Sequence, residues 1–146
     1  MKNQEQKPHD YFSVSFRIIG NNLEPPKITL LLGLEPDIAH KKGDSRTGES
    51  KSGKIITYAP FNIGIWSINS KLDKNNRLED HIINILERIE SKKDVLVKLT
   101  NEGFKMDFYC GYFFSTKDQA GISINNKLLK RIAELGIDLG INLYVT

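Results

Sequence analysis

Alternating apolar and polar residues mark several segments of this chain as strands. In "YFSVSFRII", residues 11–19, the side chains of Phe12, Val14, Phe16 and Ile18 fall on one side, and those of Tyr11, Ser13, Ser15 and Arg17 fall on the other. A period of two is typical of a strand with one buried face. The same alternation predicts strands over "NIGIWSINS", "FKMDFYCGYFF" and "IDLGINLYV". A further strand over "GISI" is expected to pair with "FKMDFYCGYFF" through a turn around Ser115 to Gln119.

Apolar residues three or four positions apart predict helices between these strands. Pro25 and Pro26 suit the first turn of a short helix that shares one apolar face and ends at Gly33. The last helix is expected to start near Asn126 and to end at Gly136, because its leucine and isoleucine residues follow helical spacing.

The middle of the chain contains the longest amphipathic helix. Asn76 and Glu79 resemble a capping box in front of apolar residues at helical spacing. The segment 94–102 fits either a strand or a helix on its residues alone. We interpret it as a helix, because Ser91 or Asp94 can cap its start and Gly103 can end it.

These elements predict one α+β domain over residues 11–146, preceded by a flexible polar tail over residues 1–10. Residues 36–60 are rich in Gly, Ser, Lys and Asp, which predicts a long loop with room for one short strand. Its basic part is the segment 40–54. The fold class is therefore expected to be a ferredoxin-like or doubled strand-helix-strand sheet with helices packed on one face.

Composition and charge indicate which partners and which cellular compartment to expect. The chain has 146 residues and a net charge of +3, but its 21 basic and 18 acidic residues are interspersed, so we expect no nucleic-acid partner. One cysteine cannot form an internal disulfide, and no apolar run is long enough to cross a membrane. The start of the chain is polar, unlike a signal peptide. We therefore expect a cytoplasmic protein with no membrane partner.

A phosphate-loop spacing occurs in the basic segment, where Gly48, Gly53 and Lys54 match G-x-x-x-x-G-K. Such a loop needs a buried strand before it, a helix after it and Ser or Thr following the lysine. Ile55 occupies the Ser or Thr position, and no helix pattern follows. The sequence therefore favours a solvated loop over a nucleotide site.

Other catalytic chemistry has no clear signature here. The three histidines, His9, His40 and His81, lack the close spacing of a zinc site, so no metal or cofactor is expected. Cys110 shares a strand side with apolar residues, which predicts a buried, unreactive thiol. Catalytic residues are therefore not assigned.

One candidate binding surface emerges from the strand pattern. If the helices cover the side that carries Phe12, the opposite sheet face gathers Arg17, Tyr109 and Tyr144, and Trp66 is expected to join them. Tyrosine, tryptophan and arginine are common anchors of protein interfaces. An ordinary solvated sheet face would show the same pattern, so the residues alone leave both interpretations open.

Several segments in order carry a resemblance to a known family. "SFRIIG", "ITLLLGLEP", "HKKGD", "IWSINS", "LERIESKKDVLVKL" and "LLKRIAELGIDLGINLYV" resemble the bacterial domain-of-unknown-function family 4279 over residues 11–145. The resemblance implies an α+β domain without established activity and favours the helix over residues 94–102. It marks the segment 42–44 and Trp66 as family positions, and it implies an immunity role toward bacterial toxins for some members. The insert 45–60 departs from the shorter family pattern.

These observations lead to a main hypothesis and an alternative. The main hypothesis is a non-catalytic binding protein, most concretely an immunity-like protein that covers the surface of a toxin partner, with Arg17, Trp66, Tyr109 and Tyr144 as anchors. The alternative is a small-molecule or anion-binding protein, or an enzyme, that uses His40, Lys41 and Lys42 in the segment 40–44. The residues do not specify an oligomeric state.

Overall fold

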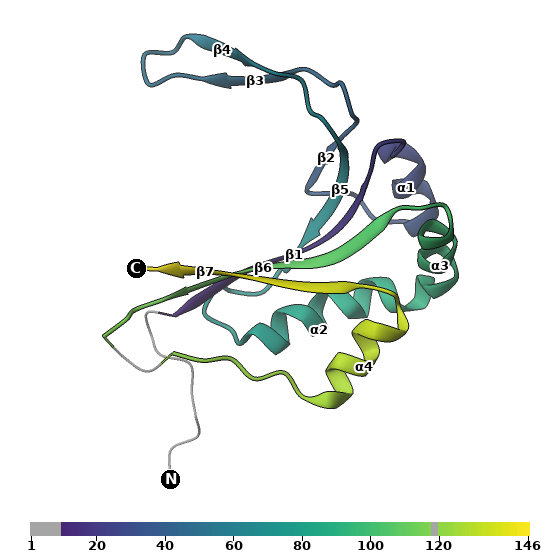
Figure 1. The fold of residues 1–146 in the computed structure, drawn as a ribbon, viewed down its shortest axis with the longest axis vertical. Coiled ribbons are helices and arrows are strands. Elements are labelled where there is room, and N and C mark those ends of the chain that lie inside the picture. The colour runs from purple at the N-terminus through teal and green to yellow at the C-terminus, as the bar shows by residue number, and fades with distance from the viewer. Residues whose placement is uncertain (1–9, 118–119) are drawn as a thin grey trace.

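The computed structural model describes residues 10–117 and 120–146, which form a five-stranded sheet, a layer of helices on one of its faces and a separate two-stranded arm (Figure 1). The strands are β1 (Tyr11–Gly20), β2 (Ile38–His40), β3 (Arg46–Glu49), β4 (Ile55–Tyr58), β5 (Gly64–Asn69), β6 (Lys105–Phe114) and β7 (Asp138–Val145). The helices are α1 (Pro25–Leu32), α2 (Leu78–Ile89), the 3₁₀ turn η1 (Glu90–Lys92), α3 (Lys93–Asn101) and α4 (Asn126–Glu134). The predicted α+β class is confirmed. Residues 1–9 of the predicted tail lie outside the described residues.

The strand order of the main sheet is β2-β5-β1-β6-β7. Neighbouring strands run antiparallel except β6 and β7, which are parallel. Because β5 is antiparallel to both β1 and β2, these two strands run in the same direction on either side of it. The chain therefore contains two strand-helix-strand units with parallel strands, β1-α1-β2 and β6-α4-β7.

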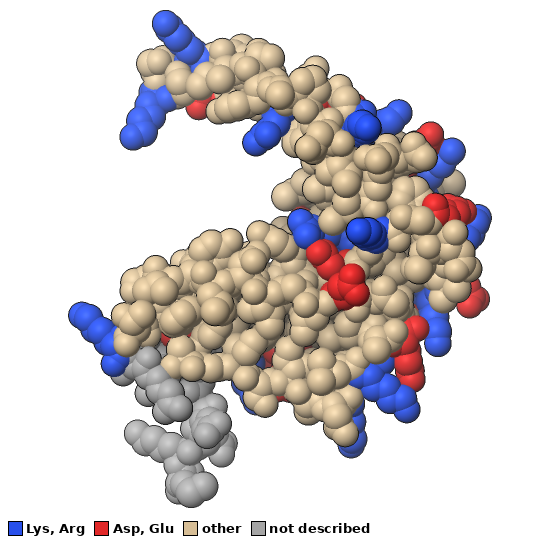
Figure 2. Space-filling model, viewed as in Figure 1, with Lys and Arg blue, Asp and Glu red and all other residues tan. Residues whose placement is uncertain are grey.

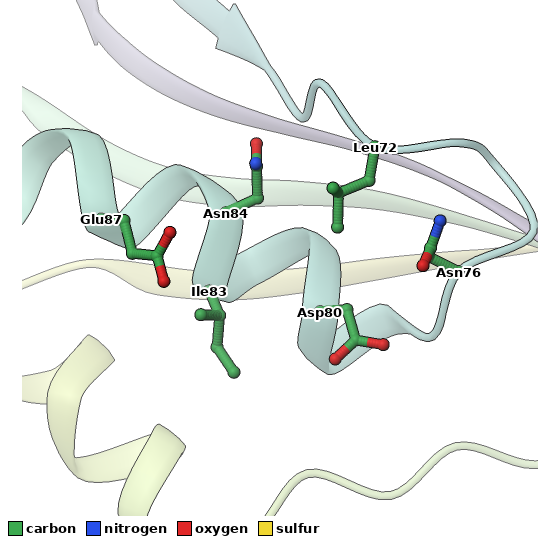
Figure 3. A pocket seen from close by; sticks show the side chains of 6 residues that line it. All are labelled: Leu72, Asn76, Asp80, Ile83, Asn84 and Glu87. Carbon is green, nitrogen blue, oxygen red and sulfur yellow. The ribbon is translucent and has the colours of Figure 1, made fainter.

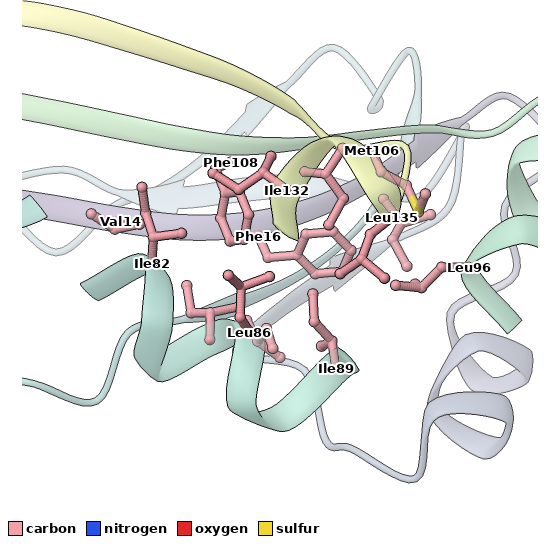
Figure 4. Close-up of a cluster of buried hydrophobic side chains, with 14 of the residues drawn as sticks. Val14, Phe16, Ile82, Leu86, Ile89, Leu96, Met106, Phe108, Ile132 and Leu135 are labelled. Atoms are coloured by element: carbon pink, nitrogen blue, oxygen red, sulfur yellow. The ribbon is translucent and has the colours of Figure 1, made fainter. Parts of the chain in front are cut away.

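The hydrophobic core lies between the sheet and α2, α3 and α4 (Figure 4). Phe16 of β1 and Phe108 of β6 are fully buried, with ring centroids 5.9 Å apart. In Figure 4, Ile82 and Leu86 of α2 point toward these two rings. Burying each such side chain contributes about 1.5–3 kcal/mol. The predicted helix-facing side of β1 is therefore the core side.

Local sequence signals set the ends of two helices as predicted. Gly33 ends α1 with a φ of 67°, and its N–H donates to the carbonyl of Thr29 at 2.8 Å. This left-handed backbone favours glycine. At the start of α4, the side chain of Asn125 accepts a hydrogen bond from the N–H of Leu128 at 2.9 Å. The segment 94–102 is helical, as predicted, since α3 covers nearly all of it.

The start of α2 differs from the prediction. The capping residue is Arg77, whose side chain makes no cap hydrogen bond. The amide of Asn76 instead donates to the carbonyl of Asp73 at 2.9 Å, and Glu79 pairs with Arg77. The predicted capping box is therefore wrong, because both of its side chains are engaged elsewhere. Within residues 10–117 and 120–146, no helix is long and apolar enough to cross a bilayer.

Two irregular regions also differ from the prediction. The expected long loop over residues 36–60 contains β2 and the paired strands β3 and β4. The expected strand over "GISI" is absent from the described residues 120–125, because β7 occupies the edge of β6. This segment is held instead by Tyr112, whose hydroxyl accepts the N–H of Gly121 at 3.1 Å. The predicted turn around Ser115 to Gln119 includes residues 118–119, which lie outside the described residues.

Candidate functional site

The sheet face without helices, here called the open face, carries a linked set of charged and aromatic side chains. Arg17 and Asp107 are register partners on β1 and β6. The guanidinium of Arg17 donates two hydrogen bonds to the carboxylate of Asp107, at 2.9 and 2.7 Å. These bonds raise the pKa of Arg17, and they fix the position of its planar group beside Asp107.

Tyr109 lies next to this ion pair. The guanidinium carbon of Arg17 sits 4.2 Å from the centroid of the Tyr109 ring, a cation–π contact. Hydrogen bonding to Tyr109 raises the pKa of Tyr144 on the neighbouring strand β7. The three residues predicted from β1, β6 and β7 are therefore linked on one face, as their alternation indicates.

An aromatic stack continues across the same strands. Phe113 lies between Tyr11 and Tyr144, with ring centroids 4.4 and 4.6 Å away and nearly parallel planes. The ammonium of Lys74 lies 4.7 Å from the Tyr11 centroid. Sequence reasoning missed Phe113, although it has the same parity in the strand as Asp107 and Tyr109. The run Tyr112, Phe113, Phe114 hides the alternation, because all three are aromatic.

Trp66 does not belong to this face, and the prediction that it does is wrong. The residue is fully buried on the helix side of β5, where its register partners are Ile18 and Ala39. Its indole N–H donates to the hydroxyl of Thr29 on α1 at 3.0 Å. Its neighbours Ile65 and Ser67 are the β5 residues that lie on the open face, because they pair with Ile19 and Arg17 of β1.

The segment with phosphate-loop spacing forms the arm. Strands β3 and β4 pair with each other, and the residues between them form its turn. The N–H of Ser50 donates to the carbonyl of Lys54 at 2.8 Å, and Gly53 has a φ of 82°. A side chain at Gly48 would approach the Tyr58 ring to 2.9 Å. Both glycines thus serve the hairpin, and Lys54 lies in its turn instead of at the start of a helix.

A row of rings and one guanidinium joins the arm to the open face. His40 lies on the open face, since its β5 partner is Ile65, and its ring stacks on Phe61 at 3.5 Å between centroids. Arg46 lies over Phe61 at 5.6 Å and over Tyr58 at 5.2 Å. Each member contacts the next, so the row connects Tyr58 of the arm to His40 on the open face.

Together the arm and the open face border a hollow. Figure 1 shows the arm rising from the β2 side and bending over the sheet face opposite α2 and α4. The space-filling view in Figure 2 shows the hollow as an open notch, with Lys and Arg side chains along the arm and a mostly uncharged sheet surface facing it. Segment 40–54 contains five basic and two acidic residues, so its net charge is +3. The whole chain has the same net charge of +3. The positive charge is therefore concentrated in the arm and its base.

The predicted anion-binding residues lie at the base of the arm. Lys41 and Lys42 are exposed, but the N–H of Lys41 already donates to the carboxylate of Asp44 at 2.7 Å. The Nδ1 atom of His40 is buried and has no hydrogen-bond partner among the described residues. The carboxylate of Asp44 therefore already accepts a hydrogen bond from one of the N–H groups that this loop could offer to an anion.

Cys110 and His81 lie in the core, and a group of acidic side chains lies on a different surface. Burial raises the pKa of the Cys110 thiol to about 12, so the predicted burial is confirmed. His81 is also buried, which lowers its pKa, and its Nδ1 lies 2.6 Å from the Ser70 hydroxyl.

A shallow depression over α2 is shown in Figure 3, with Asp80 and Glu87 on its rim and Asn84 between them. The described residues contain no cluster of three potential metal ligands.

The comparison with protein families gives a match over nearly the whole chain. The family described as "Domain of unknown function (DUF4279)" matches residues 9–146. The chain belongs to this family. No curated protein and no solved structure matches the chain. The family resemblance found in the sequence is therefore confirmed. A proposal for the function depends on the open face and the arm.

Proposed function

We propose that this DUF4279 protein is a non-catalytic binding protein whose partner is another protein held between the arm and the open face. The observation that carries the proposal is that the open face and the arm each carry a linked group of rings and arginines. One part, Arg17, Tyr109 and Tyr144, lies on the sheet. The other part, formed by Arg46 and Tyr58, lies on the arm. A partner seated in the hollow would contact both.

The chemistry of these side chains favours a protein partner. Tyrosine and arginine are enriched among residues that dominate binding energy, because they combine large apolar area with polar groups. The open-face side chains are already fixed by stacking and hydrogen bonds, so binding would cost little additional side-chain entropy. The positive arm adds attraction toward acidic surfaces, which mainly speeds association.

The immunity role expected from the sequence resemblance is the finer form of this proposal. In that form, the partner is a bacterial toxin in the cytoplasm, and the arm and open face cover its functional surface. An open face with ordered side chains and a positively charged arm suit a protein that must bind its partner rapidly.

A pull-down with two matched variants tests the proposal. The site variant carries Tyr109→Ala and Tyr144→Ala, and the control carries Leu30→Ala and Val97→Ala, since all four residues are exposed. Leu30 and Val97 lie on α1 and α3, away from the open face. We expect the native chain and the control each to retain a stoichiometric partner from a lysate of the host cells, and mass spectrometry identifies it.

Binding of the purified partner should then weaken by about 30-fold or more in the site variant, corresponding to about 2 kcal/mol for a true anchor. Circular dichroism establishes that both variants are folded. Equal retention of the partner by the site variant and the control would contradict the proposal.

The anion-binding alternative uses His40, Lys41 and Lys42 at the base of the arm. Its test is a thermal shift with inorganic phosphate, comparing the native chain with Lys42→Ala, because a ligand that binds only the native state stabilises it. A shift that disappears in Lys42→Ala would support an anion site. Absence of a shift at millimolar phosphate would remove the basis of this alternative.

A further inference from the structure

The two edges of the main sheet are built differently. At one edge, β2 has three residues and is followed by Lys41 and Lys42. At the other edge, β7 has eight residues, contains no Lys, Arg or Pro, and carries its single charge at Asp138. Short strands and lysines are common devices that prevent edge-to-edge pairing. Strand β7 lacks them, so it is open to pairing with another strand.

Backbone alternation shows which groups of β7 are available. The N–H of Thr146 donates to the carbonyl of Phe114 at 2.8 Å, so even-numbered positions direct their N–H toward β6. Successive residues of a strand direct these groups to opposite sides. Leu139, Ile141, Leu143 and Val145 therefore present N–H and C=O groups at the free edge, where no strand among the described residues pairs with them.

Exposed apolar side chains lie along this edge. Leu143 and Val145 project on the helix side of the sheet but remain 65% and 63% exposed. On α4, Leu129 is 45% exposed. Arg131 of α4 forms an ion pair with Glu90, the first residue of η1. The side of α4 that carries Arg131 therefore faces the end of α2. Leu129 lies on the opposite flank by helical spacing, which places it on the β7 side.

We propose that a second copy of this chain pairs with β7 in antiparallel orientation, with the two-fold axis at Asn142. In this register, Leu139 faces Val145 of the second copy, and Ile141 faces Leu143. These are the residues with outward N–H and C=O groups, so each pair exchanges two hydrogen bonds. The exposed Leu143 and Val145 of each copy would then lie next to α4 and Leu129 of the other.

The side chains favour this register over its neighbours. Moving the axis to residue 141 would leave Val145 without a partner inside the strand, and moving it to residue 143 would leave Leu139 without one. The axis at Asn142 also places Gly140 opposite the bulky Tyr144, and it separates the two Asp138 carboxylates by the length of the strand. The dimer is therefore isologous, with one continuous sheet twice as wide.

Site-directed cross-linking tests the register directly. Asn142→Cys places two thiols at a non-hydrogen-bonded pair, where Cα atoms are about 4.5 Å apart and a disulfide can form. Asp138→Cys is the matched control, exposed on the same face but about 27 Å from its symmetry mate. Cys110 is buried and does not interfere. We expect a disulfide-linked dimer after mild oxidation for Asn142→Cys alone.

Sedimentation of the unmodified chain provides the second measurement. We expect a concentration-dependent dimer that becomes monomeric in the Leu143→Lys, Val145→Lys variant, whose substituted side chains are exposed and should not affect folding. A monomer at about 100 μM of the native chain, or equal cross-linking at positions 142 and 138, would overturn the proposal. If β7 instead binds the partner of the open face, the purified native chain would sediment as a monomer. That result would also overturn the proposed dimer.

Discussion

The two faces of β6 show how one strand can serve two purposes. On the helix side, Phe108 is fully buried against Phe16 and the apolar stripe of α2. On the other side, its neighbour Tyr109 is 38% exposed and lies against Arg17. Both faces are rich in aromatic rings, but only the first is covered.

This difference separates stability from recognition. The covered face gains from removal of apolar area from water, whereas the open face is organised by ion pairing, hydrogen bonds and ring stacking at the surface. Surface interactions of this kind contribute little to folding. The similar ring and arginine contacts on the arm support the proposed binding role, and substitutions can test each face separately.

The largest contrast is expected between neighbouring residues of β6. Phe108→Ala should lower the free energy of unfolding by about 3–5 kcal/mol, because it leaves a cavity in the core. Tyr109→Ala should lower it by less than about 1 kcal/mol, since its ring is partly exposed. Urea denaturation followed by circular dichroism measures both. Similar losses for the two variants would mean that the open face contributes to folding as the core does.

The buried Trp66 provides a second test of the covered face. Thr29→Val keeps the size of the side chain but removes the acceptor of the indole N–H. We expect a loss of about 1–3 kcal/mol, the cost of leaving a buried donor unpaired. Urea denaturation followed by the fluorescence of this single tryptophan gives the value. An unchanged midpoint would show that the indole N–H reaches another acceptor or water.

The pH dependence of stability should report His81 at the edge of the same core. Burial lowers its pKa, so the folded state favours the neutral ring more than the unfolded state does. Its stabilisation is fully present above the ordinary histidine pKa of about 6.5 and is lost as pH falls through the lowered value. Melting temperatures between pH 7.5 and 5.5 should fall more steeply for the native chain than for His81→Gln. Parallel curves would assign the decline to other groups.

Much of the fold follows from local pattern. The strands β1, β6 and β7 each have one covered face, so their alternation is visible, and it places Arg17, Tyr109 and Tyr144 together. The helices follow from spacing and from residues such as Gly33, which suits its left-handed backbone.

Features that depend on partners distant in sequence could not be predicted in this way. Strand β5 lies inside the sheet, where Ser67 is buried on the open face and Trp66 on the covered one, so its alternation does not identify either face. The strands of the arm have mostly exposed residues, and without a buried side they leave no period to detect. The capping box predicted for α2 is wrong for a different, local reason, because Asn76 bonds to Asp73 and Glu79 pairs with Arg77 instead.

The smallest effect on folding is expected from removing the arm. Replacing residues 45–59 with a short Gly-Ser turn should change the free energy of unfolding by less than about 0.5 kcal/mol, since the side chains of β4 are all exposed. The contacts of Arg46 with Phe61 would be lost, but His40 and Phe61 would keep their stack at the base. Urea denaturation measures this change. A large loss of stability would make the arm part of the folded core, whereas an unchanged core together with lost partner binding would assign the arm to recognition.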